Sequence, residues 1–221
     1  VDAYDYAGNR VSGAGDFNND GYADFMLSAL GPSQWDAAEA VATGDISKGE
    51  AYLVYGTNSM GANLELSTLD SSQGLLIEGI SVDDQAGASV SAAGDVNGDG
   101  FSDIIIGASG ADSDGNVNDG ASYVVFGRAQ SSNSSIDLTT LNGSNGFKVT
   151  GAGSYDYSGS GVSHAGDFNG DGYSDLLISA PNKTVSDQAK AGEAYVLYGK
   201  DSGFAATISL SSIDDQSGFV I

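Results

Sequence analysis

The stretch Gly94-Asp-Val-Asn-Gly-Asp-Gly-Phe-Ser-Asp103 decides the fold, because close copies of it occur three times in the 221 residues. The other two copies run from Gly15 to Asp24 and from Gly166 to Asp175, so successive copies start 79 and 72 residues apart. Self-similarity at such a period is the sequence signature of a repeat architecture. We therefore expect the whole chain to consist of three copies of one structural unit.

Short runs rich in β-branched and aromatic residues surround each copy, and Gly, Asn, Asp or Ser bound them, which is typical of strands. In the middle unit these runs are 89–93, 104–108, 122–127 and 146–149. No segment keeps a period of about 3.6 residues, so long helices are not expected. The sequence predicts an all-β fold of three β-propeller blades, each with four antiparallel strands. The expected blades span residues 1–80, 81–151 and 152–221. A β-sandwich, the main alternative fold, would not need the same unit three times.

The repeated stretch has the pattern Asp-x-Asn-x-Asp-Gly-x-x-Asp, which predicts a calcium-binding loop. Calcium takes roughly six to eight oxygen ligands, and positions 1, 3, 5 and 9 of the pattern supply side-chain oxygens. Position 7 offers a backbone carbonyl, and Gly at position 6 allows a sharp turn because it tolerates positive φ. One Ca²⁺ per blade, about three in all, is expected. The expected ligands are Asp16, Asn18, Asp20, Tyr22 and Asp24; Asp95, Asn97, Asp99, Phe101 and Asp103; and Asp167, Asn169, Asp171, Tyr173 and Asp175.

Other interpretations of the loop account for less of the pattern. An Asx-rich turn needs no metal, but it does not require several carboxylates to lie close together three times over, which is unfavourable without a cation. An EF-hand needs a Glu at position 12, where this chain has Leu27, Ile106 and Ile178. Magnesium prefers to keep waters and to use fewer carboxylates.

These features resemble FG-GAP repeats, which occur in integrin α-subunit propellers and in many bacterial surface proteins. The "GAP" element matches Gly107-Ala108-Ser109 and Ser179-Ala180-Pro181, and more weakly Ser28-Ala29-Leu30. The "FG" element is degenerate at Ala7-Gly8, Ala86-Gly87 and Ser158-Gly159. The resemblance covers essentially the whole chain. It implies that the calcium loops join the first and second strands of each blade and that ligands bind on the opposite face.

One departure from the resembled family concerns the number of blades. Closed propellers have about four to eight blades, and three blades of ordinary geometry cannot close a ring. The chain is therefore expected either to be part of a longer array or to self-associate into a larger ring. An open arc would leave apolar blade faces exposed.

The expected ligand face contains aromatic residues beside acids in its loops. Its candidate ligand-binding residues are Trp35, Tyr4, Tyr6, Tyr155 and Tyr157. A protein or a glycan is the expected ligand, and the alternative is that these tyrosines pack as spacers between blades. A formal charge of −23 disfavours nucleic acid and anionic membranes as partners. No apolar run approaches the roughly 20 residues that span a membrane, so direct membrane insertion is not expected.

These observations predict an extracellular or cell-surface, calcium-binding module for adhesion or for protein or glycan recognition, and not an enzyme. Catalytic signals are sparse: the chain has no Cys, a single His at position 164, and no Gly-x-Ser-x-Gly motif before a helix. The acids with clear roles are assigned to metal, although a glycosidase-like or lyase-like pair of carboxylates stays open. The alternatives are a structural repeat of a surface layer, filament or large secreted protein, and a non-catalytic accessory propeller of a polysaccharide-acting enzyme.

Overall fold

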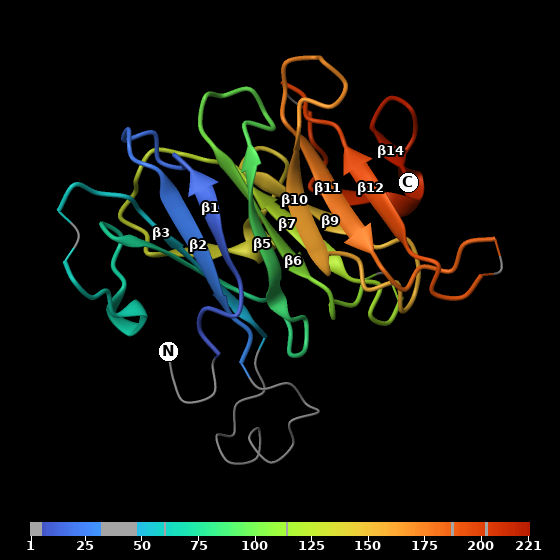
Figure 1. Cartoon of the computed structure of the whole chain (residues 1–221), viewed down its shortest axis with the longest axis horizontal. Helices are drawn as coiled ribbons and strands as arrows, with labels where there is room; N and C mark the ends of the chain where they lie inside the picture. Colours follow the sequence, from blue (N-terminus) through green and yellow to red (C-terminus); the bar gives the residue numbers. More distant parts are fainter. Residues whose placement is uncertain (1–5, 32–47, 60, 114, 187, 202) are drawn as a thin grey trace, which may run out of the picture.

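The computed structural model describes residues 6–31, 48–59, 61–113, 115–186, 188–201 and 203–221, and shows three β-sheets side by side (Figure 1). The four-stranded antiparallel unit predicted from the sequence is present in each sheet. The first sheet contains β1 (Val11–Gly15), β2 (Asp24–Ala29), β3 (Glu50–Val54) and β4 (Gly74–Glu78). The second contains β5 (Ala86–Gly94), β6 (Asp103–Ala108), β7 (Ala121–Val125) and β9 (Gly146–Thr150). The third contains β10 (Gly161–Gly166), β11 (Asp175–Ala180), β12 (Glu193–Leu197) and β14 (Gly218–Val220).

Two of the sheets have a fifth strand that the sequence did not predict. The segment before β9 forms β8 (Ser135–Asp137), which pairs in parallel with β4 of the first sheet. The segment before β14 forms β13 (Thr207–Ser209), which pairs in parallel with β9 of the second sheet. Each of these strands thus extends the outer edge of the preceding sheet. A three-residue strand carries too little hydrophobic alternation to be recognised in a sequence.

A short 3-10 helix follows each of these two strands, η2 (Leu138–Thr140) after β8 and η3 (Leu210–Ser212) after β13. A third, η1 (Leu66–Thr68), lies between β3 and β4 of the first sheet. No described helix is long and apolar enough to cross a membrane. The described residues form an open row of three sheets and not a closed ring.

The hydrophobic core consists of two layers, one between each pair of neighbouring sheets. The layer between the first and second sheets contains Phe17, Leu53 and Ile77 on one side and Ile104 and Ile106 on the other. Every residue of β6 is buried, because this central strand has a sheet on both of its faces. Neighbouring sheets therefore depend on each other for their burial of apolar surface.

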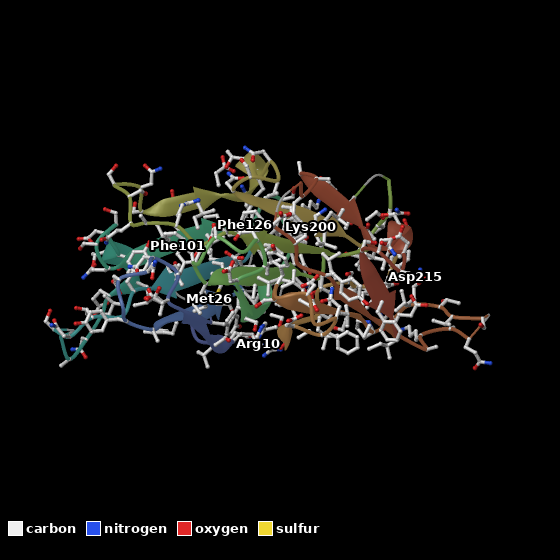
Figure 2. The ribbon with its side chains drawn as sticks, turned by 90° about the horizontal axis from the view of Figure 1, so that it is seen from above. Arg10, Met26, Phe101, Phe126, Lys200 and Asp215 are labelled. Atoms are coloured by element: carbon white, nitrogen blue, oxygen red, sulfur yellow. The ribbon has the colours of Figure 1, made fainter. Side chains whose placement is uncertain are left out.

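The layer between the second and third sheets ends in an aromatic cluster. The rings of Phe147 and Phe204 stack with centroids 4.6 Å apart, and Phe126 meets the ring of Phe204 at 5.6 Å. Lys200 places its Nζ 4.9 Å from the centroid of Phe204, and the view from above shows Lys200 and Phe126 close together (Figure 2). Such ring contacts add about 0.5–1.5 kcal/mol to the burial of area.

The first strands of the second and third sheets approach each other closely, because β5 and β10 consist largely of small residues. Val162 of β10 donates its backbone N–H to the Ser89 hydroxyl of β5 over 3.1 Å. A Cβ placed on Gly107 would lie 2.0 Å from the carbonyl oxygen of Gly159 in the next unit. Only glycine fits at that point, because the neighbouring atoms are backbone.

Candidate metal sites

The three acidic loops occupy equivalent places in the three sheets. They connect β1 to β2, β5 to β6 and β10 to β11, and they project from the same edge of the row (Figure 1). Strands on both sides of each loop are what the sequence predicted, and they exclude the helix–loop–helix arrangement of an EF-hand. Gly21, Gly100 and Gly172 at position 6 have φ between +89° and +96°, so the expected sharp turn is present.

The second loop illustrates how side chains fold the backbone around a shared centre. Asp95 accepts hydrogen bonds from the backbone N–H groups of Asp99, at 3.1 Å to Oδ1, and Gly100, at 2.9 Å to Oδ2. Asn97 Oδ1 accepts from the same Asp99 N–H at 3.0 Å, and Asp99 Oδ1 accepts from the Phe101 N–H at 3.0 Å. These bonds bring the oxygen-bearing side chains of positions 1, 3 and 5 to one turn.

The same bonds recur in the other two loops. The position 5 N–H reaches the position 1 carboxylate at 3.0 Å in both, from Asp20 to Asp16 and from Asp171 to Asp167. The amide Nδ2 at position 3 also donates to the position 5 carboxylate in all three loops. Three independent stretches of sequence thus adopt one arrangement of acceptors.

The position 9 aspartate points into the protein and ties each loop to its own sheet. Asp103 is fully buried and accepts from the Val96 N–H on Oδ2 and from the Gly127 N–H on Oδ1, both at 2.8 Å. Burial is the main cause that raises the pKa of Asp103 to about 7; the two backbone bonds oppose the rise, and the nearby charges of Asp99 and Asp95 add to it. This carboxylate therefore carries an electrostatic cost that a cation beside it would relieve.

Asp24 and Asp175 make the equivalent bonds. Asp24 accepts from Phe17 and Gly56, and Asp175 accepts from Phe168 and Gly199, over 2.7–2.9 Å. Burial raises the pKa of Asp24 above its ordinary value, and the charges of Asp20 and Asp16 contribute to the rise. In the first and second loops the position 9 acid is thus electrostatically coupled to positions 1 and 5 without facing outward like them.

The donor set of each loop suits a hard cation, since every candidate atom is an oxygen. Within the described residues, no group of three or more His, Cys, Asp or Glu side chains converges as a metal site. The reason is visible in the loop: two acids and one Asn share the turn, while the third acid is engaged with backbone N–H groups. A calcium ion there would take side-chain oxygens at positions 1, 3 and 5, together with the backbone carbonyl at position 7 and the coupled carboxylate at position 9.

Each loop is also bonded to the next one, which sequence reasoning missed. Ser102 of the second loop donates its N–H to the Asp16 carbonyl at 3.2 Å, and Ser174 of the third donates to the Asp95 carbonyl at 3.0 Å. Arg128 N–H reaches the Phe17 carbonyl at 3.0 Å, and Lys200 N–H reaches the Val96 carbonyl at 2.9 Å. The candidate metal sites therefore lie at the contacts between sheets. A cation that orders one loop would also stabilise the hydrogen bonds between that loop and the neighbouring sheet.

The candidate ligand-binding tyrosines lie at the opposite ends of the inner strands. Tyr6 and Tyr155 are exposed and Tyr157 is half-buried, so Tyr6 and Tyr155 do not act as buried spacers between sheets. Tyr4 and Trp35 lie outside the described residues. Tyr6 and Tyr157 have φ of +53°, and Tyr155 has φ of +64°. Non-glycine residues in this region are uncommon and persist only where the surrounding structure holds them.

A polar recess of about 340 Å³ lies beside the loop that contains Tyr155, and its lining includes Asp84, Asp112, Asn118 and Lys148. Asp84 is buried, which raises the pKa of its carboxyl group. Asp112 and Asp119 lie in the loop between β6 and β7. Their carboxylates accept hydrogen bonds from the backbone N–H groups of Asn118 and Ser113, respectively, so both carboxylates have partners within the loop.

Comparison with known proteins agrees with the architecture. Residues 86–125 and 158–197 match the FG-GAP repeat, and both segments contain an acidic loop. The chain is 31% identical over 166 residues to the bovine phosphatidylinositol-glycan-specific phospholipase D, and 30% identical over 166 residues to the human protein of the same name. Both alignments cover 75% of this chain and 18% of the relative, so the chain corresponds to a minor part of those proteins.

Proposed function

Because the chain carries FG-GAP repeats, we propose that it is an extracellular, calcium-binding propeller module that recognises a protein or a glycan and does not itself catalyse a reaction. The observation that carries the calcium part is the acidic loop, which has the same hydrogen bonds in all three sheets. Sites of this kind bind weakly, with Kd of about 10⁻⁴–10⁻³ M in extracellular modules, and such sites fill in calcium-rich surroundings.

Calcium titration calorimetry on the chain tests the metal part directly. The expected result is about three Ca²⁺ per chain, with weaker or absent binding of Mg²⁺. Asp99→Ala removes the position 5 carboxylate of the second loop and should abolish binding at one site. Asp112→Ala is the matched control, because it removes an exposed carboxylate at the other end of the same sheet. Equal stoichiometry in the two variants would contradict the assignment.

The recognition part rests on the face opposite the metal loops. Tyr155 is exposed, and its backbone N–H donates to the carbonyl of Val117, which lines the recess. An exposed ring beside acidic, amide and ammonium groups offers a stacking surface and hydrogen bonds for hydroxyl-rich ligands. A glycan array probed in calcium is the first screen. Tyr155→Ala should weaken a hit from the array, whereas Tyr22→Ala should not, because Tyr22 lies in a metal loop and would contribute only its backbone there. Equal binding by both variants would remove this face from the proposal.

A second candidate follows from the relatives, which are named as phospholipases specific for a phosphatidylinositol glycan. This chain would then be an accessory module that holds a glycan-bearing lipid for a catalytic unit elsewhere. The soluble glycan headgroup, without its lipid, is the discriminating probe. Binding of that headgroup would favour the accessory module. Cleavage of the intact lipid by this chain alone would overturn the non-catalytic assignment.

A further inference from the structure

A buried ion pair lies beside the third sheet, in the loop that precedes its first strand. Asp156 is 5% exposed, and the Nζ of Lys183 lies 3.0 Å from its Oδ2. Lys183 belongs to the loop between β11 and β12. Burial disfavours the ionised form of a carboxylate unless an opposite charge lies beside it. The third repeat therefore supplies a cation to this carboxylate from its own chain.

The second repeat has the same backbone arrangement around Asp84, but not the cation. The carbonyl of Asp84 accepts from the N–H two residues beyond the end of β6, and the carbonyl of Asp156 accepts from the N–H two residues beyond the end of β11, over 3.1 and 3.3 Å. The next residues along the chain, Ala111 and Lys183, each donate to the last residue of the preceding strand at 3.2 Å. Ala111 is therefore the counterpart of Lys183, and its side chain carries no charge.

The polar recess lies where the second repeat lacks this ammonium. Asp84 lines the recess and is 7% exposed. Its Oδ2 accepts from the Ser81 N–H at 2.8 Å, and its Oδ1 accepts no hydrogen bond from the described residues. Ser81 and Gly153 hold the same position in the repeat, because each accepts at its carbonyl the N–H of the aspartate three residues later, at 3.2 Å. A Cβ on Gly153 would lie 3.6 Å from the Nζ of Lys183, and Ser81 lines the recess.

Lys148 also lines the recess, but it does not take the place of the missing partner. Its Nζ lies 5.8 Å from the centroid of the Tyr123 ring, and it makes no ion pair with the described residues. Burial is the main cause that raises the pKa of Asp84; the charge of Lys148 opposes the rise, and the charge of Asp112 adds to it. Two carboxylates and one ammonium leave the recess with an excess of negative charge, which favours a cationic ligand.

We infer that the recess at Asp84 binds the ammonium group of a lysine side chain from a protein partner, in the position that Lys183 takes beside Asp156. The ammonium donates to Asp84 Oδ1, and its other two N–H groups have the Ser81 hydroxyl and the Asp112 carboxylate in the same recess. Hydrogen bonds between two charged groups are among the strong ones. The source is a protein, because the group that the third repeat itself places there is a lysine side chain. This inference rests on the proposed recognition function and names the chemical group that is recognised.

An NMR titration of the chain with N-acetyl-lysinamide tests the site. Physiological salt limits general attraction to the formal charge of −23, because it screens charges beyond about 8 Å. The amide signal of Ser81, whose N–H is bonded to Asp84, should shift and saturate. N-acetyl-norleucinamide, which has the same stem without the ammonium, should cause no such shift. Asp84→Asn should weaken binding at least about tenfold, the loss of one charge-assisted hydrogen bond. Asp156→Asn is the matched control at the same repeat position and should leave the binding unchanged.

Two exchanges between the repeats should move the site from one to the other. Ala111→Lys supplies the missing ammonium from the chain itself and should abolish probe binding at the recess. Lys183→Ala removes the internal partner of Asp156 and should create a second site, seen as a saturable shift of the Gly153 amide signal. Circular dichroism verifies the fold of both variants. Ala111 is buried, so Lys183→Ala carries the test if Ala111→Lys does not fold.

Three results overturn the inference. One is a set of small shifts spread over the acidic surface that does not saturate, and another is equal binding by the wild-type chain and Asp84→Asn. The third is saturable binding of glucosamine without binding of N-acetyl-lysinamide, which would assign the recess to an amino sugar. The titration needs no macromolecular partner, so it is separate from the proposed function. Glycan binding that Tyr155→Ala weakens and Asp84→Asn does not would support recognition on this face while it removed lysine as the ligand of the recess.

Discussion

The hydrogen bonds that the position 9 aspartate accepts hold each loop to its sheet, and their contribution to the free energy of unfolding can be predicted. Asp103→Ala removes the two acceptors of the buried Val96 and Gly127 N–H groups. Leaving a buried donor without a partner costs about 1–3 kcal/mol, so the variant should lose about 2–6 kcal/mol of unfolding free energy in calcium. For a chain of this size, this loss corresponds to a fall in Tm of at least about 4 °C.

Urea unfolding followed by circular dichroism, with and without calcium, is the assay. In EDTA at pH 7 the loss should be smaller, because the variant also removes a carboxylate whose ionised form is disfavoured by burial. Asp103→Asn keeps one side-chain oxygen and should lose an intermediate amount. Asp215→Ala, at an exposed acid, should change the free energy by less than about 0.5 kcal/mol. If Asp103→Ala were as stable as Asp215→Ala in calcium, the role of Asp103 in holding the loop to its sheet would be refuted.

Three further predictions concern pH and packing. Burial raises the pKa of Asp103 in the folded chain to about 7. In EDTA, the stability that protonated Asp103 contributes is therefore fully present below about pH 4 and is lost as pH rises through 7. The unfolding free energy of Asp103→Asn relative to wild type should increase over that range, and a constant difference would contradict this. Gly107→Ala places a Cβ 2.0 Å from the Gly159 carbonyl oxygen and should destabilise the contact between the second and third sheets, seen as faster amide hydrogen exchange in β6 and β10; unchanged exchange would argue against a tight contact. Phe147→Ala removes a fully buried ring and should cost about 3–5 kcal/mol in urea unfolding, whereas Phe25→Ala, at an exposed ring, should cost much less.

The fold was predictable because one unit repeats. The residues around Asp16, Asp95 and Asp167 are close copies of one another, so each weak strand signal has two counterparts that support it. The glycine at position 6 and the strand on each side of the loop followed from local chemistry. The segments at 135–137 and 207–209 could not be predicted in the same way, because they become strands only when the preceding sheet offers them an edge.

The sequence indicates which residues each acidic loop contains, but not how differently the structure surrounds them. The pattern alone treats Asp103 and Asp95 as equal ligands, whereas the structure buries Asp103 against two backbone N–H groups of its own sheet. The bonds from Ser102 and Ser174 to the preceding loops depend on how the sheets sit side by side, which no local pattern encodes. The aromatic residues at Tyr6 and Tyr155 could be placed in loops from the sequence, but their exposure required the structure.

Thermal unfolding in EDTA against a calcium titration tests the central claim most directly. Metal that binds only the folded chain stabilises it by RT ln(1 + [Ca²⁺]/Kd) at each site, about 2.7 kcal/mol per site at a hundredfold excess over Kd. The account predicts a Tm that rises steadily with calcium, returns to its starting value with chelator and does not rise equally with magnesium. A Tm that is the same in EDTA and in calcium would show that the three loops are acidic turns without a metal.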